Sequence, residues 1–285
     1  MTAFTHGGYA WFSCPVAKAS EEPIVPASSI TRLQAYLCHS AQQRCQSVPV
    51  PPFTIFLHPG GEASEEDHAV PDGPIGDHLR EPLARLREAF EMRARRTRIR
   101  FLAEFAPHLA SALPALGMVE ERSVELLART PDSLVPPREV PGLRMLTLDE
   151  DSALDDVREG LDTNERGFDA RTEPVTHAQA QAFRSGLVDS RAFIACIDEV
   201  PAGAGMFNPP YAGVTELLGI ATVDALHRRG VASYLSAYAA HTAFERGVGL
   251  VYLGTDNPAA RRVYERLGFR PFAVLVFYAE PPTNR

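Results

Sequence analysis

The most constraining feature of this sequence is a long apolar segment that leads directly into the start of a helix. Residues 214–223 are apolar enough for a buried strand. Residues 228–246 carry Val231, Leu235 and Tyr238 at helical spacing. A buried strand that feeds a helix over a short loop is the repeating unit of layered α/β proteins. The sequence therefore predicts an α/β fold.

A proline cluster divides the chain into two units. Pro131, Pro136, Pro137 and Pro141 fall within twelve residues, so the sequence predicts a stiff linker at 131–142. We expect one domain at 1–135 and a second at 143–285. The strands expected are 53–57, 99–103, 118–128, 143–148, 191–197, 201–207, 214–223, 250–253 and 269–278, and the helices 29–45, 77–96, 107–116, 150–160, 176–187, 228–246 and 257–267. Residues 58–76 are polar and rich in Gly and Pro, which predicts a long loop.

Composition and charge exclude several classes of function. The formal net charge is −8, which argues against a nucleic-acid partner. The four cysteines show no CxxC pair or zinc-finger spacing, so we expect no metal site. No apolar run reaches the roughly 18 residues of a membrane span, and no signal peptide is apparent at the N-terminus. These features predict a cytoplasmic protein without a membrane partner.

A Gly- and Arg-rich turn separates the apolar strand from its helix. The pattern His227-x-x-Gly230-x-Ala232 puts small residues where backbone amides can approach a ligand closely. Successive N–H groups at a helix N-terminus bind anions, and Arg228 and Arg229 add positive charge. A pyrophosphate would fit there, although most such turns taken alone bind nothing.

A second motif follows about 25 residues later. It contains Asn257, Ala260, Tyr264, Gly268 and Phe269 in the pattern Asn-x-x-Ala-x-x-x-Tyr-x-x-x-Gly-Phe. With both motifs in this order and spacing, residues 143–280 resemble the GNAT superfamily of acyl-CoA-dependent N-acyltransferases. The resemblance implies a mixed central sheet flanked by helices. His227 departs from the family pattern, which has Arg or Gln at that position.

The resemblance implies acetyl-CoA as co-substrate and assigns residues to its binding. A splayed strand end would pair with the pantetheine arm, and the turn and helix start would hold the pyrophosphate. The cofactor-binding candidates are Ala221, Thr222, Val223, His227, Arg228, Arg229, Gly230, Val231, Ala232, Ser233, Asn257, Ala260 and Tyr264.

Two side chains are candidates for proton transfer. Tyr264 occupies the position that supplies the general acid in many family members; alternatively, it is a core residue of its helix. Glu216 lies eleven residues before His227, in the register of a family base. Its apolar neighbours would raise its pKa toward a useful value. The alternatives for Glu216 are a strand-end carboxylate facing water or a substrate-binding group.

The first unit shows an element order similar to the back half of a GNAT domain. It lacks the pyrophosphate motif, so we interpret it as a degenerate, partial GNAT-like repeat that has lost CoA binding. The chain would then be a tandem of a degenerate N-terminal half and a complete C-terminal domain.

The predicted function is N-acetyl transfer from acetyl-CoA to a primary amine by direct attack in a ternary complex. The alternative is a non-catalytic acyl-CoA-binding regulatory module. The acceptor would be a small-molecule or peptide amine, and the protein a monomer or homodimer. An acidic run that includes Asp155, Asp156 and Glu159 would favour a cationic amine, or it is simply a solvated helix face.

Overall fold

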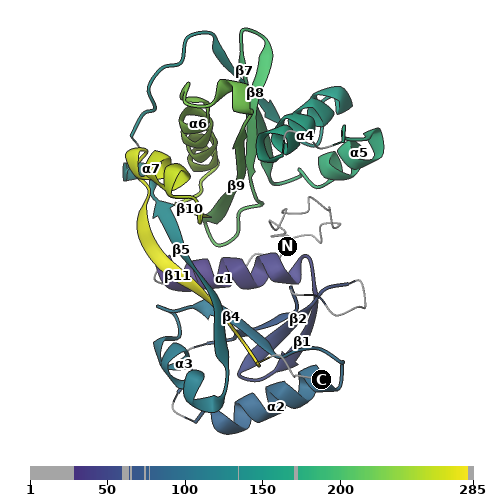
Figure 1. Ribbon diagram of the computed structural model, residues 1–285, viewed down its shortest axis with the longest axis vertical. Helices are drawn as coiled ribbons and strands as arrows, with labels where there is room; N and C mark the ends of the chain where they lie inside the picture. The colour runs from purple at the N-terminus through teal and green to yellow at the C-terminus, as the bar shows by residue number, and fades with distance from the viewer. Residues whose placement is uncertain are drawn as a thin grey trace, which may run out of the picture.

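The computed structural model describes residues 29–281 except 60–63, 65, 74, 77, 134 and 170–172. Figure 1 shows two stacked halves joined by two long strands. The lower half contains α1 (Ser29–Gln42), β1 (Gln46–Val50), β2 (Phe53–Leu57), β3 (His68–Pro71), α2 (Arg80–Glu91), β4 (Arg98–Leu102), α3 (Pro107–Ala112), the 3₁₀ turn η1 (Pro114–Leu116) and β5 (Val119–Arg129).

The 3₁₀ turn η2 (Pro131–Ser133) begins the connection to the upper half. The upper half contains β6 (Leu143–Leu148), α4 (Leu154–Phe168), α5 (His177–Ser185), β7 (Arg191–Ile197), β8 (Val200–Phe207), β9 (Val214–Thr222), η3 (Asp224–Leu226), α6 (Val231–Glu245), β10 (Leu250–Gly254), α7 (Pro258–Arg266) and β11 (Arg270–Ala279). The predicted α/β class with a mixed sheet flanked by helices is confirmed.

The two halves share one sheet of 11 strands, in the order β1-β2-β3-β4-β11-β5-β10-β9-β8-β7-β6. The strands β5 and β11 are interleaved across the halves. The last strand, β11, lies between β4 and β5, while β5 lies between β11 and β10. Each half therefore completes its sheet with a strand from the other. The domain limits 1–135 and 143–285 stay a prediction.

Helices cover both faces of the sheet. In the upper half α4 and α5 pack over Ile194 and its neighbours, whereas α6 and α7 pack over Phe193 on the opposite face, as expected for alternating side chains of one strand. Helix α1 covers the middle of the sheet through Leu33 and Tyr36. Figure 1 shows α1 at the junction between the halves, where it can contribute to a site shared by both.

The lower half differs from expectation at two strands. Residues 68–71 form β3 within the stretch predicted to be a long loop, and residues 46–50 form β1, where no strand was expected. β1 is an edge strand, the place in a sheet where proline is tolerated. The helix expected at 77–96 is shorter in the structure, where α2 covers Arg80–Glu91.

The proline-rich linker packs against the upper half. A Cβ on Gly268 would lie 2.2 Å from the Ser133 carbonyl oxygen, and one on Gly230 would lie 3.0 Å from Val140 Cγ2. Both glycines also have positive φ, +94° and +89°, which favours glycine. The linker thus runs beside both motifs found in the sequence.

Candidate active site

The strands β9 and β10 separate after a short parallel contact. They pair at only three positions, Val214 to Glu216 on β9 with Leu250 to Tyr252 on β10. β9 then continues to Thr222, with only β8 beside it among the described strands. The side of β9 that faces β10 is therefore an unpaired strand edge, which can accept an extended ligand as an added strand.

The strand end predicted to pair with pantetheine contains Ala221, Thr222 and Val223. Of these three, Thr222 directs its backbone groups toward the open side of β9. The Val223 N–H donates to the Ala202 carbonyl at 3.0 Å, so Val223 bonds toward β8. Backbone groups alternate along an antiparallel strand, so Ala221 also bonds toward β8 and Thr222 toward the open side. Gly219, with φ of +63°, lies at an irregularity in the pairing with β8 just before this segment.

The turn after β9 leads to a helix start with exposed backbone. Gly230 caps α6 with left-handed backbone, and the described part of the chain provides no side-chain cap hydrogen bond there. Arg228 also has positive φ, +61°. Arg228, Arg229 and Gly230 are exposed, whereas Val231 is buried. Ala232 and Ser233 continue the first turn of α6. Helix N–H groups beside two guanidinium groups are a geometry that suits an anion.

His227 has a local structural contact. Its Nε2 lies 2.7 Å from the Thr222 carbonyl oxygen and 3.7 Å from Asp224 Oδ1. A carbonyl can only accept, so Nε2 carries the hydrogen in this contact. The imidazole thus connects the turn to the end of β9. This contact gives the histidine a structural role at this position.

The second motif folds as the start and body of α7. Asn257 caps the helix, because its Oδ1 accepts from the backbone of Ala259 at 2.8 Å and of Ala260 at 3.3 Å. Ala260 packs on the core beneath the helix. Phe269 lies edge-on to Tyr264, with ring centroids 5.9 Å apart. Local packing and capping thus account for part of this motif.

Tyr264 is buried in the core between α6 and α7. Its side chain is 8% exposed, and burial raises the pKa of its hydroxyl to about 12. The hydroxyl therefore stays protonated throughout the neutral range and can donate a hydrogen bond to a developing negative charge.

Glu216 lies where β9 and β10 begin to separate. Burial raises the pKa of its carboxyl, while Arg44, Arg100 and hydrogen bonds from Asn208 and Tyr252 act in the opposite direction. Burial is the largest of these effects. A carboxylate with a raised pKa is a stronger base than an exposed one, which suits it to accept a proton from an amine.

Three neighbours of Glu216 were not predicted from the sequence. Asn208 Nδ2 donates to Glu216 Oε2 at 3.1 Å, Tyr252 stands opposite Glu216 on β10, and the Tyr36 ring from α1 meets Tyr252 edge-on at 5.5 Å. Asn208 could have been found, because the β8–β9 hairpin register of Phe207 with Leu217 puts residue 208 opposite 216. Tyr252 and Tyr36 come from distant segments, and no local pattern indicates them.

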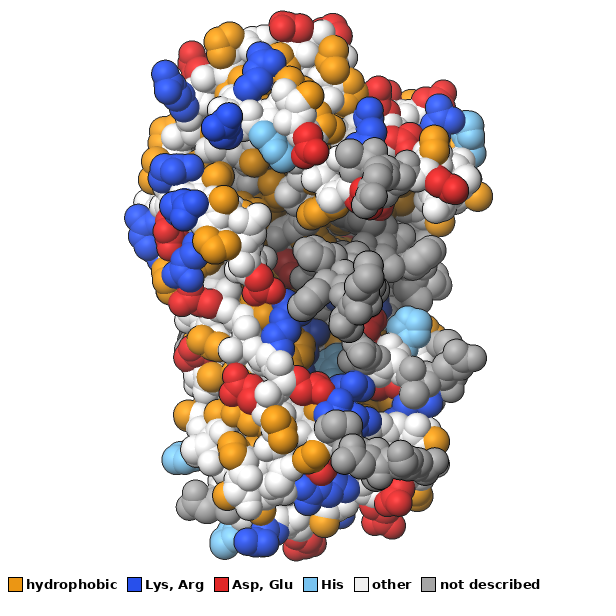
Figure 2. All heavy atoms as spheres, in the orientation of Figure 1, with side chains coloured by type: hydrophobic (Ala, Val, Ile, Leu, Met, Phe, Trp, Pro, Cys, Tyr) orange, Lys and Arg blue, Asp and Glu red, His pale blue; other side chains and the backbone are white. Residues whose placement is uncertain are grey.

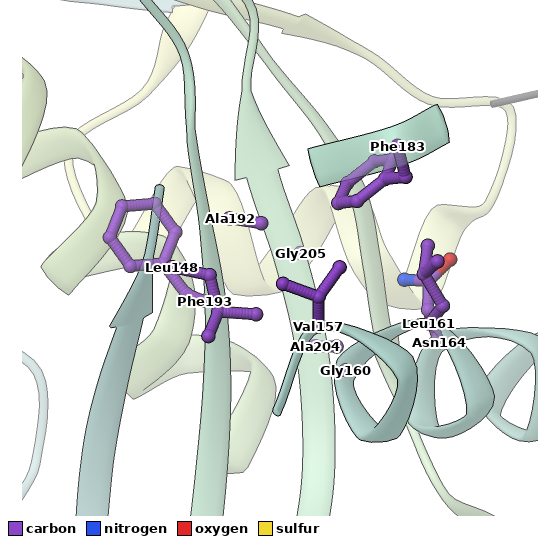
Figure 3. A pocket seen from close by; sticks show the side chains of 10 residues that line it. All are labelled: Leu148, Val157, Gly160, Leu161, Asn164, Phe183, Ala192, Phe193, Ala204 and Gly205. Carbon is purple, nitrogen blue, oxygen red and sulfur yellow. The ribbon is translucent and has the colours of Figure 1, made fainter. Parts of the chain in front are cut away.

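A separate cavity lies under α4 in the upper half (Figure 3). Its lining is almost wholly apolar and includes Leu148, Val157 and Phe183, with Asn164 at one side. The Asn164 Nδ2 donates to the Gly219 carbonyl, and Oδ1 has no hydrogen-bond partner among the described residues. The cavity is about 10 Å³, the room of about one water molecule, so it is too small for either substrate.

Other sequence candidates gain little from the structure. No three His, Cys, Asp or Glu side chains come together as a metal site within the described residues. Cys14 lies outside those residues.

Asp155 on α4 is exposed and lies 3.5 Å from Arg158, which favours the solvated-face interpretation of the acidic run. Within the part of the chain that the structure describes, no helix has the length and apolarity to cross a membrane.

Comparison with known proteins identifies the fold. Residues 155–269 match the family model of the acetyltransferase (GNAT) family. The chain has the GNAT fold. The match covers both motifs of the candidate site, and the family and fold together support an acyl-transfer function.

Solved structures extend the likeness to both halves. A GCN5-related N-acetyltransferase from Kribbella flavida has a TM-score of 0.72 and 24% identity, covering 89% of this chain and 96% of that one. A tandem GNAT protein from the clavulanic acid biosynthesis pathway has a TM-score of 0.58 and 16% identity, covering 90% and 96%. A conserved protein of unknown function from Staphylococcus epidermidis has a TM-score of 0.53 and 14% identity, covering 83% and 94%. No curated protein matches the sequence.

Proposed function

We propose that this protein is an N-acetyltransferase that transfers an acetyl group from acetyl-CoA to a primary amine within a ternary complex. The observation that carries the proposal is the arrangement along β9. A carboxylate of raised pKa, Glu216, lies at one end of an unpaired strand edge, and a helix start without a side-chain cap, beside Arg228 and Arg229, lies at the other.

The described residues fit the parts of a CoA molecule. Its pyrophosphate would bind the first N–H groups of α6, with Arg228 and Arg229 beside them. Its pantetheine arm would pair with the backbone N–H of Thr222 on the open edge of β9, since the Thr222 carbonyl already contacts His227. When bound, the co-substrate supplies an activated acyl group as a thioester.

Side chains of this protein would accept the proton of the amine and supply one to the leaving thiolate. Glu216 accepts a proton from the amine, directly or through water, so that the nitrogen lone pair is available for attack. Asn208 holds Glu216 Oε2 in place. Tyr264 donates a hydrogen bond or a proton to the leaving sulfur. No cysteine lies in either motif, so this scheme needs no covalent enzyme intermediate.

The alternative is an acyl-CoA-binding module without catalysis. A binding module has no use for a carboxylate of raised pKa at the fork between β9 and β10. The presence of both Glu216 and Tyr264 therefore favours an enzyme over a module.

The test compares thiol release from acetyl-CoA over a broad amine panel. We expect wild type to release CoA with at least one amine and Tyr264→Phe to be slower by roughly ten- to a thousandfold, with CoA affinity nearly unchanged. Tyr238→Phe is the matched control, because Tyr238 also lies on the core that contains Tyr264. Tight CoA binding without release for any amine would favour the non-catalytic module.

A further inference from the structure

One face of helix α1, in the lower half, points at the β8–β9 hairpin that contains Glu216. Arg32, Tyr36 and His39 are spaced i, i+4 and i+7, so they lie on the same side of this helix. Figure 1 shows α1 crossing between the two halves. The face drawn in Figure 2 is hollowed between the halves, and acidic and basic side chains are visible in the hollow. The lower half therefore presents polar side chains to the candidate site of the upper half.

Arg32 and His39 hold the turn of this hairpin. Arg32 Nε donates to the Ala212 carbonyl at 2.8 Å, and Arg32 Nη2 donates to the Gly213 carbonyl at 2.9 Å. The His39 ring stacks on the Tyr211 ring, with centroids 3.8 Å apart and an angle of 4° between the planes. Ala212 and Gly213 both have positive φ, +50° and +69°, as the two central residues of a tight hairpin turn do. Helix α1 thus fixes this turn at two points.

The same hairpin holds Asn208 beside Glu216. The Asn208 N–H donates to the Glu216 carbonyl at 3.0 Å, and Asn208 Nδ2 donates to Glu216 Oε2 at 3.1 Å. The Thr215 hydroxyl donates to the Asn208 carbonyl. Asn208 lies only three residues before Tyr211, so the contacts of α1 with the turn also restrain the Asn208 amide.

Tyr36 lies between these two contacts on the helix and faces Glu216. It is 1% exposed and packs edge-on against Tyr252, which stands opposite Glu216 on β10. Asn208 and Glu216 are close enough to act on the pKa of the Tyr36 hydroxyl, yet within the described residues no hydrogen bond of normal geometry reaches it. Burial, helped by the charge of Glu216, raises this pKa, so the hydroxyl is protonated near pH 7 and can donate.

We propose that Tyr36 is a positioning residue of the acetyltransferase site, whose hydroxyl donates to Asn208 Oδ1 and so keeps Asn208 Nδ2 directed at Glu216 Oε2. This inference rests on the proposed function. Hydrogen bonds in active sites are often long or poorly aligned before the substrate binds, and they shorten in the complex. An asparagine that donates its amide hydrogen to a carboxylate still has an oxygen to accept a hydrogen bond. Without Tyr36 the amide is free to turn, which would direct its oxygen at the Glu216 carboxylate.

The pKa of Glu216 reports this arrangement. Burial raises the pKa, and the hydrogen bond from Asn208 acts in the opposite direction. The titratable and charged groups around Glu216 come from four segments: Tyr36 on α1, Arg44 just after α1, Arg100 on β4 and Tyr252 on β10. Arginines stay charged near neutral pH, and burial raises the pKa of both tyrosines. A weaker bond from Asn208 should therefore appear as a higher pKa of Glu216.

The experiment follows the Glu216 carboxyl directly in the full chain. Glutamate carboxyl carbons are labelled with ¹³C for NMR titration, and Glu216→Gln identifies the Glu216 signal by its absence. We expect Tyr36→Phe to raise the titration midpoint of Glu216 by about 0.5 to 1 pH unit, the effect of weakening one hydrogen bond to a charged group. The acid limb of the pH profile of kcat/KM should move by the same amount, while CoA affinity stays unchanged.

Two further variants separate positioning from packing. Tyr278→Phe is the matched control, because Tyr278 is also buried but its hydroxyl donates to Glu120 in the lower half; the Glu216 midpoint should not move. In an Asn208→Ala background the midpoint is already raised, so adding Tyr36→Phe should raise it no further. Unfolding temperatures of all variants report whether the fold is maintained.

The outcomes distinguish this inference from the proposed function. An unchanged Glu216 midpoint in Tyr36→Phe would overturn the inference. So would a full further rise in the Asn208→Ala background, because Tyr36 would then act without Asn208. CoA binding and transfer by wild type, with the midpoint unchanged in Tyr36→Phe, would overturn only the inference. The expected midpoints in a protein that binds no CoA would retain the link from Tyr36 to Glu216 and reject the acetyltransferase.

Discussion

The two halves contain the same unit, a parallel strand pair whose first strand leads into a helix, but within the described residues only the upper half has a helix start beside two exposed arginines. In the lower half β3 pairs with β4 and leads to α2; in the upper half β9 pairs with β10 and leads to α6. Both connecting segments have eight residues, 72–79 and 223–230. Loop length and topology therefore do not account for the difference.

The difference lies in what the two loops do with their side chains. Residues 72–79 bury Ile75 and Leu79 in the lower core and contain two aspartates and no Lys or Arg. Residues 223–230 instead leave Arg228, Arg229 and Gly230 exposed. The loop at 72–79 packs against the lower core through its apolar side chains. The loop at 223–230 instead leaves the start of α6 exposed. In the lower half, the loop thus contributes to packing where the upper loop exposes a helix start.

The largest expected effect comes from separating the halves. Residues 143–285 alone would lose β4 and β5 beside β11, and β5 beside β10. Two strands would then expose unpaired edges and apolar surface, which promotes aggregation. We expect aggregation by size-exclusion chromatography, and recovery of soluble protein when residues 1–142 are co-expressed. A soluble truncation that binds CoA as well as the full chain would contradict this prediction.

The next effect tests the two loops directly. Gly230→Asp adds a side chain at positive φ and a negative charge at the helix start, so calorimetric titration should detect no CoA binding. Gly247→Asp is the matched control, because Gly247 also has positive φ, +85°, but follows the C-terminus of α6. Gly76→Asp, in the loop of the lower half, should also bind normally. Wild type should bind one CoA per chain, and two sites would show that the first loop is functional.

The sequence predicts the upper half more completely than the lower half. The predicted bounds of α6 and β9 lie within about three residues of the bounds in the structure. Both segments are long, so their apolar pattern repeats over many positions. β3 is only four residues long and offers no such repeat. The interleaving of β5 with β11 joins segments about 150 residues apart, and local patterns do not contain that information.

The candidate site shows the same limit. Glu216, Gly230 and Tyr264 lie in continuous motifs, so a sequence comparison can find them. Tyr36 and Arg100 reach the site only through the packing of α1 and β4, and their side chains are ordinary for a helix and a strand. A residue is predictable here when its role depends on neighbours in the chain, and unpredictable when it depends on neighbours across the sheet.

A smaller but more diagnostic change is Glu216→Gln, which keeps the shape and removes the base. Turnover should fall by roughly 10²- to 10⁴-fold near neutral pH and recover partly at high pH, where more of the amine is already deprotonated. Glu199→Gln is the control, because Glu199 is an exposed residue of the β7–β8 hairpin. Wild-type turnover across the whole pH range would show that Glu216 is structural.

The same variant has a stability signature. Burial raises the pKa of Glu216, so the folded state holds this proton to a higher pH than the unfolded chain does. The stability contribution of this group therefore falls as pH rises from its ordinary value of 4.5 through the raised pKa. Glu216→Gln should unfold at a higher temperature than wild type at pH 7, and the difference should shrink as the pH falls toward 4.5. Equal unfolding temperatures at pH 7 would contradict the raised pKa.

The smallest effect concerns His227, the one position where the pyrophosphate motif departs from the family pattern. If the helix N–H groups bind the anion and the imidazole only connects the turn to Thr222, then His227→Ala removes one hydrogen bond and no binding charge. One hydrogen bond contributes about 1 kcal/mol, so CoA affinity should fall by roughly fivefold. Raising the salt concentration should weaken CoA binding equally in both proteins, because Arg228 and Arg229 remain. A loss of a hundredfold or more, or a smaller salt effect in the variant, would show that the imidazole itself contacts the phosphate.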